Sequence, residues 1–152
     1  MKPLLLSVAL VALAGPLLAQ DAQHMIVKPE GLTWTDNRAL PKGAQTAVLA
    51  DYAKTGINVR RHKFPANYRV PPHTHPDAET LTIISGSLGI GVGDTFDQQS
   101  GQMLTAGSWY MVPAKHPHFV WTGSEETIVH LHSNGPGGID YVNPADDPRR
   151  GQ

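Results

Sequence analysis

The stretch Pro72-His73-Thr74-His75-Pro76-Asp77-Ala78-Glu79 decides the fold of this chain and carries most of its chemistry. Its two histidines stand two residues apart, so on a strand both side chains point to the same face. The carboxylate of Glu79 follows four residues after His75, and a later segment, residues 113–118, adds an imidazole at His118. Three neutral imidazoles and one carboxylate are a typical ligand set for a divalent transition metal such as Mn, Fe, Ni or Zn. The residues therefore predict a small β protein that holds one metal ion.

The spacing of these residues resembles the two motifs of the cupin superfamily. The first motif has the pattern H-x-H-x3-E-x6-G, which is met by His73, His75, Glu79 and Gly86. The second has the pattern G-x5-P-x4-H, which is met by Gly107, Pro113 and His118. The resemblance implies an all-β fold, a single cupin-type β-barrel or double-stranded jelly roll. It also implies that the metal ligands are His73, His75, Glu79 and His118. The alternative is a metal-free barrel whose histidines pair with their neighbours.

Three positions depart from the motifs. Asn67 stands where a glycine usually opens the first motif, and Asn is the next most tolerant residue of a left-handed backbone. Lys115 and Thr122 replace the glycine and the asparagine that are usual in the second motif. None of these positions is a metal ligand in the family, so they bear on loop conformation rather than on the site.

The first residues are typical of an export signal. Lys2 gives a short positive start, residues 4–18 are almost wholly apolar, and Ala19 offers a small residue at a cleavage position before Gln20. The alternative is a buried N-terminal helix, which Pro16 disfavours. No second apolar run reaches spanning length, so we expect a periplasmic or secreted protein without a membrane anchor after cleavage.

Composition limits the classes of partner. Removing 19 of the 152 residues leaves 133, which suits one domain. We therefore expect a signal peptide at residues 1–19, an N-terminal arm at 20–45, and a barrel with a Gly/Pro-rich tail at 46–152. The chain has 12 basic and 13 acidic residues, which excludes an attraction to nucleic acid, and it has no cysteine to form a disulfide.

The hydrophobic pattern predicts many short strands. Short arm strands are expected at residues 25–27 and 32–35, a half-buried strand at 57–64, and a hairpin that joins 119–121 to 127–131. Residues 139–142 are expected to add an edge strand.

The segment Leu88-Gly89-Ile90-Gly91-Val92-Gly93 alternates perfectly, with one aliphatic face and one face without side chains. The bare face either leaves room for a substrate near the metal or marks tight packing.

The remaining histidines have weaker claims to a function. His116 could compete with His118 for the metal, although the motif spacing favours His118. His130 and His132 share one strand face, so they either support the site or lie on the surface. We expect His62 to face solvent or the arm.

The reaction stays open between three classes. A metal-dependent enzyme of the dioxygenase, oxidase, decarboxylase or lyase class, acting on a small oxygen-rich organic substrate, is the first hypothesis that the resemblance implies. A non-catalytic periplasmic protein that binds a metal or small ligand is the second. A metal-independent sugar-type isomerase is the third. The resemblance also implies a homodimer as one form of assembly.

Overall fold

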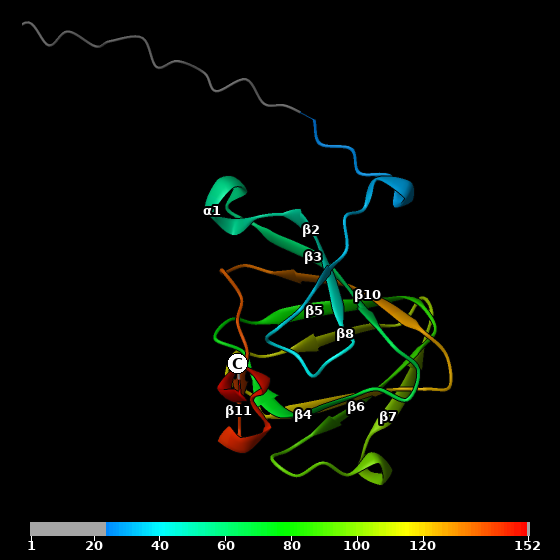
Figure 1. Cartoon of the computed structure of the whole chain (residues 1–152), viewed down its shortest axis with the longest axis vertical. Coiled ribbons are helices and arrows are strands. Elements are labelled where there is room, and N and C mark those ends of the chain that lie inside the picture. The colour runs from blue at the N-terminus through cyan, green and yellow to red at the C-terminus, as the bar shows by residue number, and fades with distance from the viewer. Residues whose placement is uncertain (1–23, 152) are drawn as a thin grey trace, which may run out of the picture.

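The computed structural model describes residues 24–151, so the predicted signal peptide lies outside the described residues. Two antiparallel sheets face each other, and Figure 1 shows them as the upper and lower halves of the molecule. The first sheet has six strands in the order β1-β2-β3-β10-β5-β8. Its strands are β1 (Thr35–Asp36), β2 (Gln45–Ala50), β3 (Asn58–Phe64), β10 (Thr127–Ser133), β5 (Glu79–Ser85) and β8 (Trp109–Val112).

The second sheet has five strands in the order β11-β4-β9-β6-β7. Its strands are β11 (Asp140–Tyr141), β4 (Arg69–Thr74), β9 (His118–Thr122), β6 (Ser87–Val92) and β7 (Gln102–Thr105). The helical pieces are short: α1 (Tyr52–Thr55) and the 3₁₀ turns η1 (Pro29–Gly31), η2 (Gln98–Ser100), η3 (Pro144–Asp146) and η4 (Pro148–Gly151). The predicted all-β jelly roll is confirmed. Its sheets stay open, however, because no hydrogen-bonded ladder within residues 24–151 joins them into a closed barrel.

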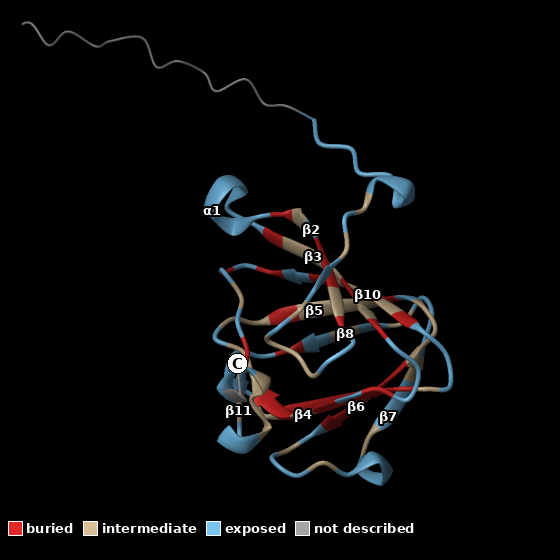
Figure 2. Ribbon diagram, viewed as in Figure 1, coloured by how far each residue is buried: buried red, intermediate tan, exposed pale blue. Residues whose placement is uncertain are grey.

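The core lies between the two sheets, and both contribute buried apolar residues to it. Figure 2 shows buried segments on the strands of both sheets. Ile83 and Val129 from the first sheet and Val70 and Leu88 from the second are at most 1% exposed. Alternate residues of a strand point to opposite faces, so each sheet buries one face here and leaves the other toward solvent.

The glycines of β6 answer the question that the sequence left open. A Cβ on Gly89 would come within 1.9 Å of the Trp121 ring, and one on Gly91 within 2.1 Å of the Phe119 ring. The bare face is therefore filled by aromatic side chains of β9. The opposite face, with Leu88 and Ile90, lines the interior cavity. The glycines thus reflect tight packing and leave no room for a substrate.

Several strand predictions need correction. The expected hairpin of 119–121 with 127–131 is wrong, because β9 pairs with β4 and β6 while β10 pairs with β3 and β5. The chain between them crosses from one sheet to the other. Residues 25–27 are exposed and form no strand, and the predicted arm strand is reduced to β1, which extends the first sheet beside β2. The strand expected at residues 57–64 is confirmed as β3, and the edge strand expected at 139–142 is present as β11.

The motif departures are accommodated by local geometry. Asn67 and Lys115 both have a positive φ, of 54° and 57°, so each takes the left-handed turn for which glycine is the usual residue. The Thr122 hydroxyl accepts a hydrogen bond from the Tyr68 amide at 2.8 Å and donates one to the Pro65 carbonyl at 2.6 Å. Thr122 therefore anchors the turn around Asn67 through its side chain.

Within residues 24–151, no helix is long and apolar enough to cross a membrane.

Candidate metal centre

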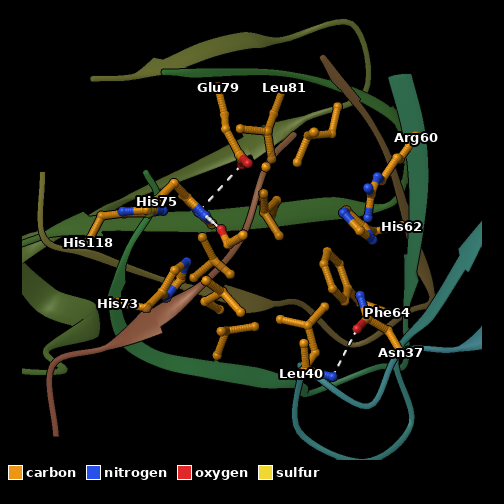
Figure 3. A pocket seen from close by; sticks show the side chains of 18 of the residues that line it. Asn37, Leu40, Arg60, His62, Phe64, His73, His75, Glu79, Leu81 and His118 are labelled. Carbon is orange, nitrogen blue, oxygen red and sulfur yellow. Dashed lines mark hydrogen bonds and ion pairs between the residues drawn. The ribbon is translucent and has the colours of Figure 1, made fainter. Parts of the chain in front are cut away.

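Three histidines from the two motifs converge at one end of the space between the sheets (Figure 3). His73 on β4 and His118 on β9 are cross-strand partners, and His75 follows directly after β4. Each offers one ring nitrogen, and these three atoms lie within 4.8 Å of one another. His73 and His118 are each 3% exposed. A cluster of this size and composition could hold one transition metal ion.

Each imidazole is oriented by a backbone carbonyl. The Nδ1 atoms of His73, His75 and His118 lie 2.7 Å from the Pro71 oxygen, 2.5 Å from the Gly138 oxygen and 3.1 Å from the His116 oxygen, respectively. A carbonyl only accepts, so each Nδ1 carries the proton and donates it. The Nε2 atoms therefore keep their lone pairs for a metal, which is the usual arrangement around metal-binding histidines.

Glu79 lies beside this triad and comes from the other sheet. It begins β5, is 4% exposed, and places its Oε2 atom 3.4 Å from the Nε2 atom of His75. Burial raises the pKa of the Glu79 carboxyl to about 8; the charge of Arg60 lowers it in part, and that of Asp77 raises it. A neutral buried carboxyl next to three imidazoles would ionise readily if a cation were bound, because an adjacent positive charge lowers a carboxyl pKa.

The three imidazoles are neutral at physiological pH. Burial lowers the pKa of His118 to about 4, with a further contribution from His75. Burial also lowers the pKa of His73 far below its ordinary value, and that of His75 to a lesser degree. A neutral imidazole is the form that binds a metal, so the histidines need not lose protons first.

The C-terminal tail helps to build the site, which the sequence interpretation missed. Gly138, whose carbonyl holds His75, has a φ of 150°, and the preceding Gly137 has a φ of 74°. The Gly137 amide donates to the Asp77 carboxylate at 3.1 Å. Downstream, β11 pairs with β4, with Tyr141 opposite His73. The Gly-Pro-Gly-Gly run was the available signal, but only the fold shows that it closes over the first motif.

The other histidines separate clearly from the triad. His116 is exposed in the loop before β9. On β10, Val129 and Leu131 point inward, so the alternating His130 and His132 face away from the cavity, which supports a surface location. Of the two locations expected for His62, the solvent-facing one is wrong: His62 is 9% exposed and lines the cavity, together with arm residues such as Ala39 and Leu40.

The cavity beside the triad has a volume of about 180 Å³ and mostly apolar walls. The aliphatic part comes from both sheets, with Leu81 and Leu131 facing Leu88 and Ile90, and the arm closes one end with Ala39 and Leu40. The polar lining residues beyond the triad and Glu79 are Asn37, Asn58, Arg60, His62, Tyr110 and Arg149.

Comparison with known proteins places this geometry in a family. No family model matches the chain. Germin-like protein 3-1 of Oryza sativa subsp. japonica is 31% identical over 124 residues, which cover 78% of this chain and 54% of that protein. The chain thus spans about half of that relative, and 34% of each of two other germin-like proteins of the same species.

Two solved structures are similar in fold. The polyketide cyclase RemF from Streptomyces resistomycificus superposes with a TM-score of 0.68 at 18% identity, covering 83% of this chain and 90% of RemF. Oxalate oxidase in complex with the substrate analogue glycolate superposes with a TM-score of 0.60 at 22% identity, covering 84% and 68% of the two chains. Together with the two motifs and the germin-like relatives, this fold shows that the chain belongs to the cupin superfamily.

Proposed function

We propose that this cupin is a metal-dependent enzyme that acts on a small oxygen-rich organic molecule, with His73, His75, His118 and Glu79 as the metal ligands. The observation that carries the proposal is the convergence of three neutral imidazoles, each with its Nδ1 donating to a backbone carbonyl, at the end of a cavity. A site fixed so firmly, yet opening onto a cavity, suits a metal that must also bind a small molecule.

A divalent ion bound there would act as a Lewis acid on a substrate oxygen, or exchange electrons with O₂ if it is redox-active. The chain's own residues would hold and orient the reactants. Glu79 would give up its proton on ligation, and the apolar walls around Leu81 and Ile90 would keep bulk water away. The likeness to oxalate oxidase with bound glycolate supports a small oxygen ligand as the type of substrate.

The metal content of the purified protein tests the first half of this proposal. We expect about one transition metal ion per chain, and loss of it in His73→Ala and His118→Ala variants that stay folded. The matched control is His130→Ala, which removes an imidazole from the outer face of β10 and should leave the metal in place. If native protein holds no transition metal and takes up none on reconstitution, the metal-site proposal fails.

Turnover is the second half of the test. Metal-loaded protein would be screened with small organic acids, diols and enols for oxygen uptake, for release of carbon dioxide and for elimination products. Activity that disappears with a chelator and returns with one particular ion would support a metal-dependent enzyme. Activity that survives complete removal of the metal would contradict it and favour the isomerase alternative. Metal binding without turnover of any substrate would favour the non-catalytic binding protein.

We further propose that the chain is exported, with cleavage after Ala19, because residues 1–19 have the pattern of a secretory signal. N-terminal sequencing of the protein recovered from its native host should start at Gln20. A start at Met1, or recovery in the cytoplasm alone, would contradict the proposal. The homodimer implied by the resemblance remains a prediction, which sedimentation of the mature chain would measure.

A further inference from the structure

One arginine that lines the cavity, Arg60, has no ion-pair partner among residues 24–151. Two arginines reach this space, and they differ in their partners. Arg149 pairs with the Asp147 carboxylate at 2.7 Å. Over residues 24–151, the side-chain ion pairs are Asp147–Arg149 and His75–Glu79, so Arg60 takes part in neither. A half-buried guanidinium beside apolar walls is costly unless an anion accompanies it. Arg60 is thus the cavity group that most needs a ligand.

Arg60 is held in a defined orientation. Its Nε atom donates to the Asn58 Oδ1 atom at 2.7 Å. Asn58 is itself fixed, because its amide nitrogen donates to Ser133 Oγ at 2.9 Å and to the Pro136 carbonyl at 3.2 Å. Among the described residues, neither terminal guanidinium nitrogen of Arg60 has a hydrogen-bond or ion-pair partner, so the two-pronged end of Arg60 is left for something else. That end is the geometry that binds a carboxylate through two parallel hydrogen bonds.

His62 presents a second donor next to Arg60, and its tautomer follows from a chain of hydrogen bonds. The side-chain oxygen of Asn37, Oδ1, accepts from the Ala39 amide at 3.0 Å, which turns the Asn37 side-chain NH₂ group toward Thr46. The Thr46 hydroxyl accepts from that group at 2.9 Å, and its own hydrogen is then free to go to His62 Nδ1 at 2.8 Å. With the Thr46 hydroxyl donating to Nδ1, the proton of the neutral imidazole sits on Nε2.

The Nε2 atom of His62 opens into the cavity. In the described part of the chain, Arg61 Nε is the one side-chain nitrogen or oxygen that is both sealed from solvent and unpartnered. Within residues 24–151, His62 Nε2 has no hydrogen-bond partner, yet it is not among the sealed atoms, so it must keep access to the cavity. Figure 3 shows Arg60 and His62 together on one side of this space, with His73, His75 and His118 on the other side.

We propose that Arg60 and His62 form a carboxylate-binding subsite, so that the substrate is a small organic anion held at both ends. This inference rests on the proposed function: one oxygen group of the substrate binds at the His73–His75–His118 end, and a carboxylate reaches Arg60. The charges support it, because a divalent ion with one carboxylate ligand, plus the Arg60 cation, leaves two positive charges for the substrate to balance. The leucine and isoleucine walls between the two ends suit a short apolar middle.

A series of dicarboxylates and their half-amides tests the subsite. Malonate, succinate and glutarate, with malonamate, succinamate and glutaramate, would be titrated calorimetrically into metal-loaded protein. The half-amide keeps the length and the hydrogen-bonding oxygen but removes one charge. For the dicarboxylate of matching length we expect binding about tenfold or more tighter than for its half-amide, as for other hydrogen bonds to charged groups.

Variants assign that preference to Arg60. Arg60→Gln should abolish it with unchanged metal content and melting temperature, and Arg60→Lys should restore part of it. The matched control is Arg61→Gln, which removes the same charge from the opposite face of β3, away from the cavity, and should keep the preference. If no pair in the series shows the preference, or if the preference survives in Arg60→Gln, the subsite is refuted.

Metal analysis of the same samples separates the two proposals. Protein that takes up no metal would refute the metal centre. The subsite would then be judged on metal-free protein, where acetate binding should still be weaker in Arg60→Gln than in Arg61→Gln. Equal acetate binding by those two variants would refute the subsite as well.

Discussion

The ionisation of Glu79 makes a quantitative prediction about metal binding. In the metal-free protein, burial raises the pKa of this carboxyl to about 8, whereas the three imidazoles have lowered pKa values. At pH 7 the histidines are therefore ready to bind and the carboxyl is mostly protonated. If Glu79 is a ligand, the incoming ion must displace that one proton.

The expected size follows from the difference between the pH and this pKa. One pH unit below a pKa of about 8, roughly one carboxyl in ten is ionised, and forcing ionisation costs on the order of 1 kcal/mol. The apparent affinity for the metal should thus rise about tenfold per pH unit from pH 6 to pH 7, and level off above pH 8. In Glu79→Gln, whose side chain cannot ionise, this dependence should disappear.

Competition against a chelator of known affinity, at several pH values and corrected for the chelator's own protonation, would give the slope. Calorimetry in two buffers with different ionisation enthalpies would independently count the released protons, and about one is expected near pH 7. An affinity that does not change between pH 6 and pH 7, or a slope that persists in Glu79→Gln, would refute the assignment of Glu79 as the ligand that ionises.

Three further predictions concern the surroundings of the site. Gly138→Ala puts a side chain on a residue with a φ of 150° and should displace the carbonyl that holds His75, so chelator competition should show metal affinity weakened by about ten- to a hundredfold. Gly89→Ala drives a Cβ into the Trp121 ring and should lower the free energy of unfolding in urea by about 1–3 kcal/mol, with metal content per folded chain unchanged. The third prediction concerns His62. In the folded protein, burial and then the charge of Arg60 lower the pKa of His62 to about 4. As the pH falls from about 6.5 to 4, this imidazole therefore becomes protonated in the unfolded chain but stays neutral in the folded one. The free energy of unfolding of the metal-free protein should therefore fall over that range, with His62 contributing up to about 1.4 kcal/mol per pH unit. In urea unfolding of His62→Gln, this contribution to the pH dependence should be absent.

The sequence predicted the metal end of the cavity well because that end is local. His73 and His75 lie on one short segment, and a fixed spacing suffices to place them together. His118 was found through its own motif, and the fold brings it opposite His73 on the neighbouring strand. The left-handed turn at Asn67 was also predictable, since few other residues tolerate that backbone.

Strand pairing could not be predicted from the sequence where it depends on which of the two sheets a strand joins. The segments that became β9 and β10 are close in sequence and separated by Gly123 and Ser124, which is a typical hairpin signal. They nevertheless enter different sheets, and no local feature distinguishes a hairpin from a crossing between sheets. The same limit applies to the tail, because Gly138 holds His75 across 63 positions of the chain.

The opposite wall of the cavity was missed for a different reason. In β3 the residues that point inward are Asn58, Arg60, His62 and Phe64, so most of the inward face is polar. An alternating strand is normally interpreted with its polar face toward water, and that rule made solvent one of the two locations expected for His62. The rule fails here because β3 turns its polar face toward an internal cavity. The opposite face of β3 bears Arg61 and Lys63 beside Val59, so both faces of the strand are partly polar, and this was the available warning.

The position of Glu79 gives the proposed metal a structural consequence as well as a chemical one. His73 and His118 belong to the second sheet, whereas Glu79 begins β5 in the first, and no ladder in the described chain joins the two sheets. An ion held by all three would connect the sheets at the end of the jelly roll where the histidine triad lies. Because binding to the folded state alone stabilises it, such an ion would favour the closed packing of the sheets around the cavity. The same contact would fix the distance from the metal to Arg60 on β3, and with it the length of the anion that the cavity can accept.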